Sequence, residues 1–254
     1  FENWRDGLGW ENWRADMGRT MTPAEEAAHR AKIEAARRER EAEEAKRKHE
    51  ARERACLLWA EAYPSTGHAY LTRKGFPALE CLTLTVMHKT GGVTFRAGDV
   101  VVPLYDDTGV LVNLQLINSD GLKRTLKGGQ VKGACHTIEG KKQAGKRLWI
   151  AEGYATALTV HHLTGETVMV ALSSVNLLSL ASLARQKHPA CQIVLAADRD
   201  LNGDGQTRAA AAAQACEGTV ALPPVFGDWN DAFMQKGEEA TRKAIYDAIR
   251  PPAD

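Results

Sequence analysis

Short apolar runs alternate with longer mixed segments over the C-terminal part of the chain. Short apolar runs are expected as strands at 148–151, 167–172, 192–197 and 219–222, and the segments between and after them as helices at 154–163, 177–186, 207–216 and 238–249. Apolar strands that alternate with helices are typical of a parallel sheet covered by helices on both faces. The pattern therefore predicts an α/β domain over residues 146–254.

The residues before this domain, 64–145, show strands without regular helices between them. The expected strands, rich in Val, Leu and Thr, are TLTV (83–86), VTF (93–95), DVVVPLY (99–105) and GVLVNLQLI (109–117). The run Asp-Asp-Thr-Gly at 106–109 is a hairpin turn signal between the last two. We expect a smaller α+β subdomain here.

Residues 22–63 consist mainly of Ala, Glu, Arg and Lys. Thr22, Pro23 and Glu25 form a helix start with a capping box. Ile33 is the only large aliphatic residue over most of the length, and no heptad stripe is present, which disfavours a coiled coil. We expect one long, charged, solvated helix that links two domains and buries little apolar surface. Because the glutamates nearly cancel the arginines, a nucleic-acid-binding role for this helix is less favoured.

Residues 1–21 contain a short repeat, ENWR at 2–5 and again at 11–14. It is interpreted as a hairpin or as the tail of a missing upstream domain. The chain has no initiator Met and no secretory signal, so a fragment is expected.

Composition narrows the function only slightly. A hydrophobic fraction of 44% and a charged fraction of 26% are ordinary for a globular protein, and the net charge of +1 gives no global sign of a nucleic-acid partner. The five cysteines form no CxxC pair, so no zinc site is expected in this chain. Their odd number suits a reducing cytoplasm. The longest uncharged stretch, 167–184, is broken by polar residues, so no membrane span is predicted.

Three carboxylates stand directly after expected strands. Glu152 follows the first strand of the α/β domain, and Asp198 and Asp200 follow the third. Ligand sites form at the carboxyl edge of such sheets, so these groups are expected to meet within a few ångströms. Mg²⁺ or Mn²⁺ would relieve their repulsion and bridge them to phosphate oxygens. Taken singly, the Glu could be a helix N-terminal charge and the Asp residues a turn; their order and matching positions favour a site.

The runs EGYATA (152–157) and AADRD (196–200) resemble the Toprim domain shared by bacterial-type primases, type IA and type II topoisomerases and some nucleases. Residues 68–233 further resemble the primases of conjugative plasmids and related mobile elements, through the blocks HAYLTRKG (68–75), VVPLYDDTGVLVNLQLI (101–117), GLKRTLKGG (121–129) and FGDWNDAF (226–233). The resemblance implies that Glu152 is the catalytic acid/base and that Asp198 and Asp200 bind Mg²⁺. It also suggests that Lys123 and Arg124 meet template or nucleotide phosphates.

One position departs from this family. Many replicative primases carry a further Asp where this chain has Thr156. The site would then have fewer metal ligands, or Asp204 would substitute. Family members commonly begin with a zinc-binding domain, which this chain does not show.

Other candidate residues carry weaker signals. Four basic residues surround Gly128-Gly129, and they are interpreted either as a flexible loop that binds a phosphate backbone or as a solvated hairpin. They are Lys123, Arg124, Lys127 and Lys132. Asp228, Asn230 and Asp231 read equally well as outer metal contacts or as a helix cap. The pair 161–162, His-His, is expected on a helix surface.

The favoured function is a DNA primase core that makes short oligonucleotides on single-stranded DNA from nucleoside triphosphates. A Toprim nuclease and a non-catalytic nucleic-acid-binding module of a DNA-transfer protein are the alternatives. The chain has no evident nucleophilic tyrosine in a separate domain, which disfavours a topoisomerase. A helicase or DNA-transfer machinery is a further expected partner.

Overall fold

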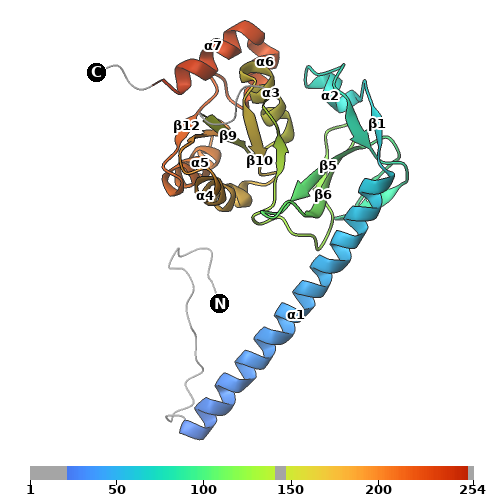
Figure 1. Ribbon diagram of the computed structural model, residues 1–254, viewed down its shortest axis with the longest axis vertical. Helices are drawn as coiled ribbons and strands as arrows, with labels where there is room; N and C mark the ends of the chain where they lie inside the picture. Colours follow the sequence, from blue (N-terminus) through green and yellow to red (C-terminus); the bar gives the residue numbers. More distant parts are fainter. Residues whose placement is uncertain (1–21, 141–146, 251–254) are drawn as a thin grey trace. The chain divides into compact units, whose positions relative to one another are not determined.

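The structure, a computed structural model, describes residues 22–140 and 147–250. Two five-stranded sheets carry most of the core of these residues (Figure 1). The ENWR repeat at 2–14 lies outside the described residues. No helix of the described ranges has the length and apolar character that crossing a bilayer requires.

The first sheet is antiparallel, in the order β1-β2-β5-β6-β7. Its strands are β1 (Tyr63–Ser65), β2 (Cys81–Thr83), β5 (Val100–Tyr105), β6 (Leu111–Ile117) and β7 (Lys123–Thr125). A short helix, α2 (Ala69–Arg73), follows β1, and a separate hairpin joins β3 (His88–Thr90) to β4 (Val93–Phe95). This confirms the predicted α+β unit. The basic segment at 123–125, expected to be a loop, is instead an edge strand of this sheet.

The second sheet has the order β12-β11-β9-β10-β8. Four strands are parallel, namely β9 (Arg147–Ala151), β10 (Thr167–Val170), β11 (Gln192–Ala196) and β12 (Thr219–Ala221). The fifth, β8 (His136–Ile138), pairs antiparallel with β10. The predicted domain boundary at 145/146 therefore falls too late: β8 precedes it in sequence but belongs to this sheet, because its ladder partner is β10.

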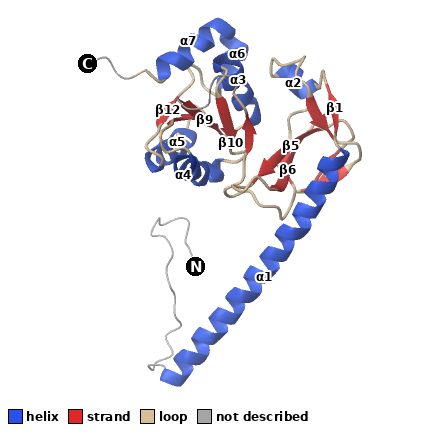
Figure 2. Cartoon of the chain, viewed as in Figure 1, coloured by secondary structure: helices blue, strands red, loops and turns tan. Residues whose placement is uncertain are grey.

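Helices cover both faces of the second sheet, as predicted (Figure 2). One face packs against α4 (Leu177–Lys187) and α5 (Asp204–Ala215), with a short 3-10 turn, η1 (Ser174–Asn176), before α4. The other face packs against α3 (Tyr154–Thr164), α6 (Trp229–Lys236) and α7 (Glu238–Ala248). The α/β fold class is thereby confirmed.

The two sheets are joined through α3. Tyr70 and Leu71 of α2 and Ile117 of β6 share one buried cluster with Tyr154 and Leu158 of α3. A second contact stacks Phe76, just after α2, on Phe233 of α6, with ring centroids 5.7 Å apart. These contacts hold the segment after α2 beside the N-terminal end of α6.

The predicted long helix is α1 (Pro23–Glu61). Its start has the expected capping box, in which the Thr22 backbone N–H donates to Glu25 Oε2 at 2.8 Å and the Glu25 N–H donates to Thr22 Oγ1 at 3.3 Å. On its surface, Glu34 and Arg38 form an ion pair at 3.1 Å. The expectation of little buried apolar surface holds only for the first part, because Ala51 and Ala55 are fully buried.

The C-terminal part of α1 belongs to the core of the first sheet. Ala55 and Leu58 pack in one cluster with Leu84, Phe95 and Leu116. The chain from residue 46 onward therefore forms one compact unit that includes the C-terminal part of α1.

We expect a chain shortened to begin at residue 46 to keep the melting temperature of the full chain, whereas one that begins at residue 56 melts lower. The second truncation removes Ala51 and Ala55, both 0% exposed, and opens the face they cover. Lost burial of this size costs on the order of 1–3 kcal/mol, and each kcal/mol corresponds to roughly 2–4 °C in a domain of this size. Thermal melting of the two truncations side by side measures the difference, and equal melting temperatures would contradict the packing of α1.

Candidate active site

The predicted carboxylates lie at the carboxyl edge of the second sheet. In the parallel ladder Ala196 of β11 pairs with Ala151 of β9. Glu152 follows Ala151 directly, and Asp198 comes two residues after Ala196. The sheet register therefore brings these two side chains to neighbouring positions at one edge.

Asp198 is the most perturbed of these groups. Burial raises the pKa of its carboxyl from 3.8 to about 7, and the charges of Asp228, Glu152, Asp200 and Asp231 add to the shift. Its Oδ1 atom is buried and accepts no hydrogen bond within the described part of the chain. A buried carboxylate oxygen without a donor is costly, which marks it as an acceptor for a cation or proton that arrives with a ligand.

Glu152 is half-buried beside Asp198. Burial raises the pKa of its carboxyl, the guanidinium of Arg208 lowers it, and the charge of Asp200 raises it again. Lys123 and the backbone amide of Ser174 also favour its charged form. A carboxylate with a raised pKa is suited to accept a proton near neutral pH.

Asp200 and Asp204 are more exposed and serve the loop that carries them. Asp200 Oδ2 accepts the Gly205 N–H at 3.0 Å, and the Asp200 N–H donates to Gln206 Oε1 at 3.1 Å. Asp204 is the first residue of α5, where a negative charge favours the helix dipole, and its Oδ2 accepts from Asn202 at 2.9 Å. These bonds fix the loop after β11 and leave Asp200 at the edge of the cluster.

The fourth carboxylate beside Asp198 is Asp228. It is the N-cap of α6: its Oδ1 accepts the Asp231 N–H at 2.8 Å, and Asp231 Oδ2 accepts the Asp228 N–H at 3.0 Å. The helix-cap interpretation is confirmed. Thr156, which stands where many primases carry an Asp, donates its hydroxyl to Asp228 Oδ2 at 3.0 Å. Thr156 therefore supplies a hydrogen-bond donor that orients a carboxylate from α6, in place of the Asp that many primases carry there.

These carboxylates alone supply only part of the ligand shell that a divalent cation needs. They act on one another's pKa, yet among residues 22–140 and 147–250 no three Asp, Glu, His or Cys side chains converge as a ready-made metal site. That Glu152, Asp198 and Asp200 bind a metal ion together stays a prediction, and their charges already act on one another's pKa. Mg²⁺ commonly uses one or two carboxylates and completes its shell with water and substrate phosphates. The unpartnered Asp198 Oδ1 suits that arrangement.

The structure separates the two basic residues that the sequence analysis paired. Lys123 is half-buried, and its ammonium lies 5.6 Å from the centre of the Tyr70 ring. Burial and the charge of Lys74 lower the pKa of Lys123, while Asp228, Asp198 and Glu152 raise it. Arg124 is exposed on the other face of β7 and packs along Gly91. Lys123 thus joins the carboxylates, and Arg124 does not.

Lys127 and Lys132 are both exposed and make only backbone contacts with neighbouring segments. The Lys127 N–H donates to Thr90 Oγ1 at 2.9 Å, and its carbonyl accepts from Arg54 at 3.3 Å. The Lys132 carbonyl accepts from Gln130 at 3.3 Å. Their role in binding nucleic acid stays a prediction.

Three further basic residues, which the sequence analysis did not single out, line the site. Arg73 and Lys74 lie with Lys123 in a cavity of about 480 Å³. Arg208 of α5 donates to Ser174 Oγ at 3.0 Å and lies close enough to Glu152 to lower its pKa. The sequence block at 68–75, which contains Arg73 and Lys74, was the one feature that could have pointed to these two residues.

The motif at 228–231 places Lys74 in that cavity. Asn230 is fully buried, and its Nδ2 donates to the Lys74 carbonyl at 2.8 Å and to Thr159 Oγ1 at 3.0 Å. The Lys74 ammonium lies 4.0 Å from Asp231 Oδ1. The start of α6 therefore supplies a carboxylate to the cluster and also holds a lysine from the first subdomain beside it.

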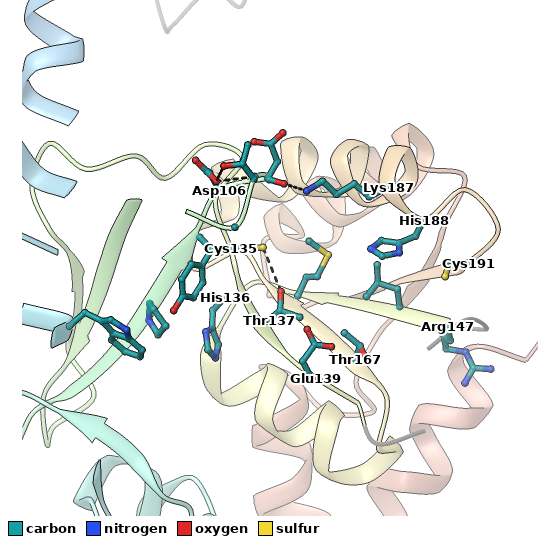
Figure 3. A pocket seen from close by; sticks show the side chains of 18 residues that line it. Asp106, Cys135, His136, Thr137, Glu139, Arg147, Thr167, Lys187, His188 and Cys191 are labelled. Atoms are coloured by element: carbon teal, nitrogen blue, oxygen red, sulfur yellow. Dashed lines mark hydrogen bonds between the residues drawn. The ribbon is translucent and has the colours of Figure 1, made fainter. Parts of the chain in front are cut away.

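A larger cavity of about 820 Å³ contains none of the predicted site residues (Figure 3). Figure 3 shows side chains from the turn at Asp106, the end of α4 at Lys187 and strand β8 at Thr137 around it. Arg147 and Thr167, at the amino ends of β9 and β10, also line it. It therefore opens at the strand ends opposite to the carboxylates.

Comparison with known proteins identifies relatives of this chain. Residues 147–239 match the Toprim domain family. Two proteins from Escherichia coli, both named DNA primase TraC, are 33% identical over 144 residues and 32% identical over 174 residues; these stretches are 53% and 65% of this chain. The chain spans only 14% and 11% of the length of those relatives.

Solved structures show the same fold. A chain in the structure of bacteriophage T7 lagging-strand DNA polymerase interacting with primase domains of two gp4 subunits is 18% identical, with a TM-score of 0.50. The match covers 73% of this chain and 92% of that one.

The α/β part of the molecule is a Toprim domain. Over about half to two thirds of its length, the chain is similar to DNA primase TraC.

Proposed function

We propose that the chain is the catalytic core of a DNA primase, which joins nucleoside triphosphates into short oligonucleotides on a single-stranded DNA template. The observation that carries this proposal is the Asp198 carboxylate, which has a buried, unpartnered oxygen and lies close enough to Glu152 and Lys123 for the charges to interact. Acidic and basic groups in such proximity suit a site that takes a metal ion together with phosphates.

Asp198 and Glu152 would hold Mg²⁺ or Mn²⁺, with water and substrate phosphates completing the ligand shell and with Asp200 and Asp228 at the margin. Such an ion neutralises phosphate charge and lowers the pKa of a bound hydroxyl. The ammonium groups of Lys74 and Lys123 bind phosphate oxygens from the cavity they share with Arg73.

In the reaction, the 3′-hydroxyl oxygen of one nucleotide forms a bond to the α-phosphorus of the next, and the bond to pyrophosphate breaks. Glu152, whose pKa is raised by burial, accepts the proton from that hydroxyl. Asp228 keeps its orientation through the Thr156 hydroxyl and the capping box of α6. Lys123 offsets the charge that develops on the phosphates.

The partners that this function requires are a single-stranded template and nucleoside triphosphates. A helicase or DNA-transfer machinery and a cytoplasmic location fit the same proposal. A nuclease would use the same carboxylates to cleave DNA. A binding module would not need these carboxylates.

One assay separates these functions. The chain is incubated with circular single-stranded DNA, labelled nucleoside triphosphates and Mg²⁺, and the products are resolved on a denaturing gel. Short labelled oligomers that require the template support primase activity. Linearised or shortened DNA without oligomers would point to the nuclease, and intact DNA without oligomers to the binding module.

The separation of Lys123 from Arg124 gives a matched pair of variants. Lys123→Ala is expected to lower synthesis roughly 10- to 100-fold, because a charged contact to phosphate is worth about 1.5–3 kcal/mol. Arg124→Ala, one residue away on the other face of β7, is expected to change it less than about threefold. Steady-state synthesis rates of both variants, with melting curves as a control for folding, test this. Equal losses of synthesis in the two variants would show that Lys123 contributes only through its charge and not through a specific phosphate contact.

A further inference from the structure

A second cavity, of about 770 Å³, lies beside the carboxylates and has a different character. Its wall combines the arginines 199 and 208 with two exposed apolar side chains, Leu201 and Phe226, and also contains the carboxylates of Asp200 and Asp204. Leu201 is 87% exposed and Phe226 is 64% exposed. Large apolar side chains left open to solvent next to a catalytic cluster are typical of a binding surface.

The backbone next to Phe226 is fixed by its neighbours. The next residue, Gly227, exchanges two backbone hydrogen bonds with Arg199, at 2.8 and 3.1 Å. Gly227 has φ +107°, and a Cβ there would meet Asp231 Oδ2 at 2.2 Å, so only glycine permits this path. The Phe226 backbone is therefore fixed between the loop after β11 and the capping box of α6.

The charged groups of the cavity are suited to phosphate. The Nε atom of Arg199 is buried and has no hydrogen-bond partner in the described ranges. Arg208 reaches from α5 toward Glu152. Guanidinium groups pair with phosphate oxygens through several N–H donors, and an aromatic ring offers a flat surface for a base. Apolar and cationic groups together match the two halves of a nucleotide.

We propose that Phe226 is a stacking platform for an unpaired nucleobase, with Leu201 at its side and Arg199 and Arg208 on the adjoining phosphates. The base belongs either to the template strand or to an incoming nucleoside triphosphate. This assignment rests on the proposed synthesis on single-stranded DNA and adds the residue that grips a base there. A protein partner on the same surface would recognise the apolar side chains but not the base.

The test uses the full chain and the variants Phe226→Ala and Phe226→Trp. Binding is measured with oligo(dT), with an oligomer of the same length whose central positions are abasic, and with ATP in the presence of Mg²⁺. Phe226→Ala is expected to weaken the binding of oligo(dT) or of ATP roughly 5- to 100-fold, and Phe226→Trp to retain it. In the Phe226→Trp variant the added tryptophan fluorescence is expected to fall when the ligand binds.

The ligand that loses affinity identifies the source of the base. If it is oligo(dT), the preference of the wild-type chain for oligo(dT) over the abasic oligomer is expected to shrink in Phe226→Ala. Met87→Ala is the matched control, because Met87 is 72% exposed and lies outside this cavity. It is expected to bind all three ligands as the wild-type chain does.

Two results would overturn the stacking proposal. If Phe226→Ala binds oligo(dT) and ATP as tightly as the wild-type chain does and still makes primers, Phe226 is not a stacking platform. The proposed function is then unaffected. A wild-type chain that binds neither ligand and makes no primers removes both proposals.

Discussion

Replacing Glu152 with glutamine is expected to lower the rate of primer synthesis by about 10³-fold or more while the chain stays folded. The glutamine keeps the shape of the side chain but cannot accept a proton, and a positioned base contributes typically about 10²–10⁴-fold. Loss of a charge that also faces the metal adds to the effect. Synthesis on circular single-stranded DNA under saturating nucleotide and Mg²⁺ measures it.

Glu139→Gln is the matched control for this variant. Glu139 is exposed and lines the cavity at the opposite strand ends, so its change is expected to leave synthesis within about twofold of the wild-type rate. If Glu152→Gln retains more than about a tenth of the wild-type rate, Glu152 is not the proton acceptor.

Asp198→Asn is expected to reduce synthesis at least about 100-fold and yet to raise the melting temperature of the metal-free chain at pH 8. Burial and four neighbouring carboxylates raise the pKa of Asp198 from 3.8 to about 7, so the folded chain holds this proton more tightly than the unfolded chain. The stability that the proton contributes is complete below about pH 4 and is lost as the pH rises through about 7. Asparagine carries no charge at any pH and avoids this loss.

The pH dependence makes the prediction specific. In EDTA the two proteins are expected to melt alike near pH 4, and the variant is expected to melt a few degrees higher near pH 8, at roughly 2–4 °C for each kcal/mol. A purely structural role for Asp198 predicts that the variant melts lower at every pH and keeps its specific activity when folded. That pattern would remove Asp198 from the site.

The buried strands could be predicted from the sequence because their apolar runs are long and continuous. Strands β5, β9 and β11 are buried along nearly all their length, and each falls within one or two residues of its expected position. The three-residue strands β7 and β8 escaped prediction, whereas β4 and β12, which are equally short, were expected. A strand this short is defined by its ladder partner, which only the folded chain supplies.

The helix α6 was not among the expected helices, although a helix cap was one of the two interpretations of its first residues. In the structure Asp228 and Asp231 form the two halves of a capping box. The burial of Trp229 and Asn230 then fixes the helix on α3 and on the segment after α2.

For the candidate site, the sequence placed Glu152 and Asp198 at one edge because the ends of parallel strands share an edge. It could not show that Lys123 faces this edge and Arg124 does not, because that depends on the pairing of β7 with β6. It also could not bring Lys74 beside Asp231, since these residues lie far apart in the chain and meet only when α2 docks on α6.

The central claim, that the carboxylates around Asp198 are the catalytic metal site, is tested most directly by Mn²⁺ binding. Mn²⁺ is titrated into the wild-type chain and Asp198→Asn, and the bound fraction is read from the loss of the free-ion electron paramagnetic resonance signal, with and without nucleoside triphosphate. The wild-type chain is expected to bind Mn²⁺, Mg²⁺ to displace it and nucleotide to strengthen the binding, whereas Asp198→Asn is expected to bind at least about tenfold more weakly. Equal Mn²⁺ binding by the two proteins, with and without nucleotide, would contradict it.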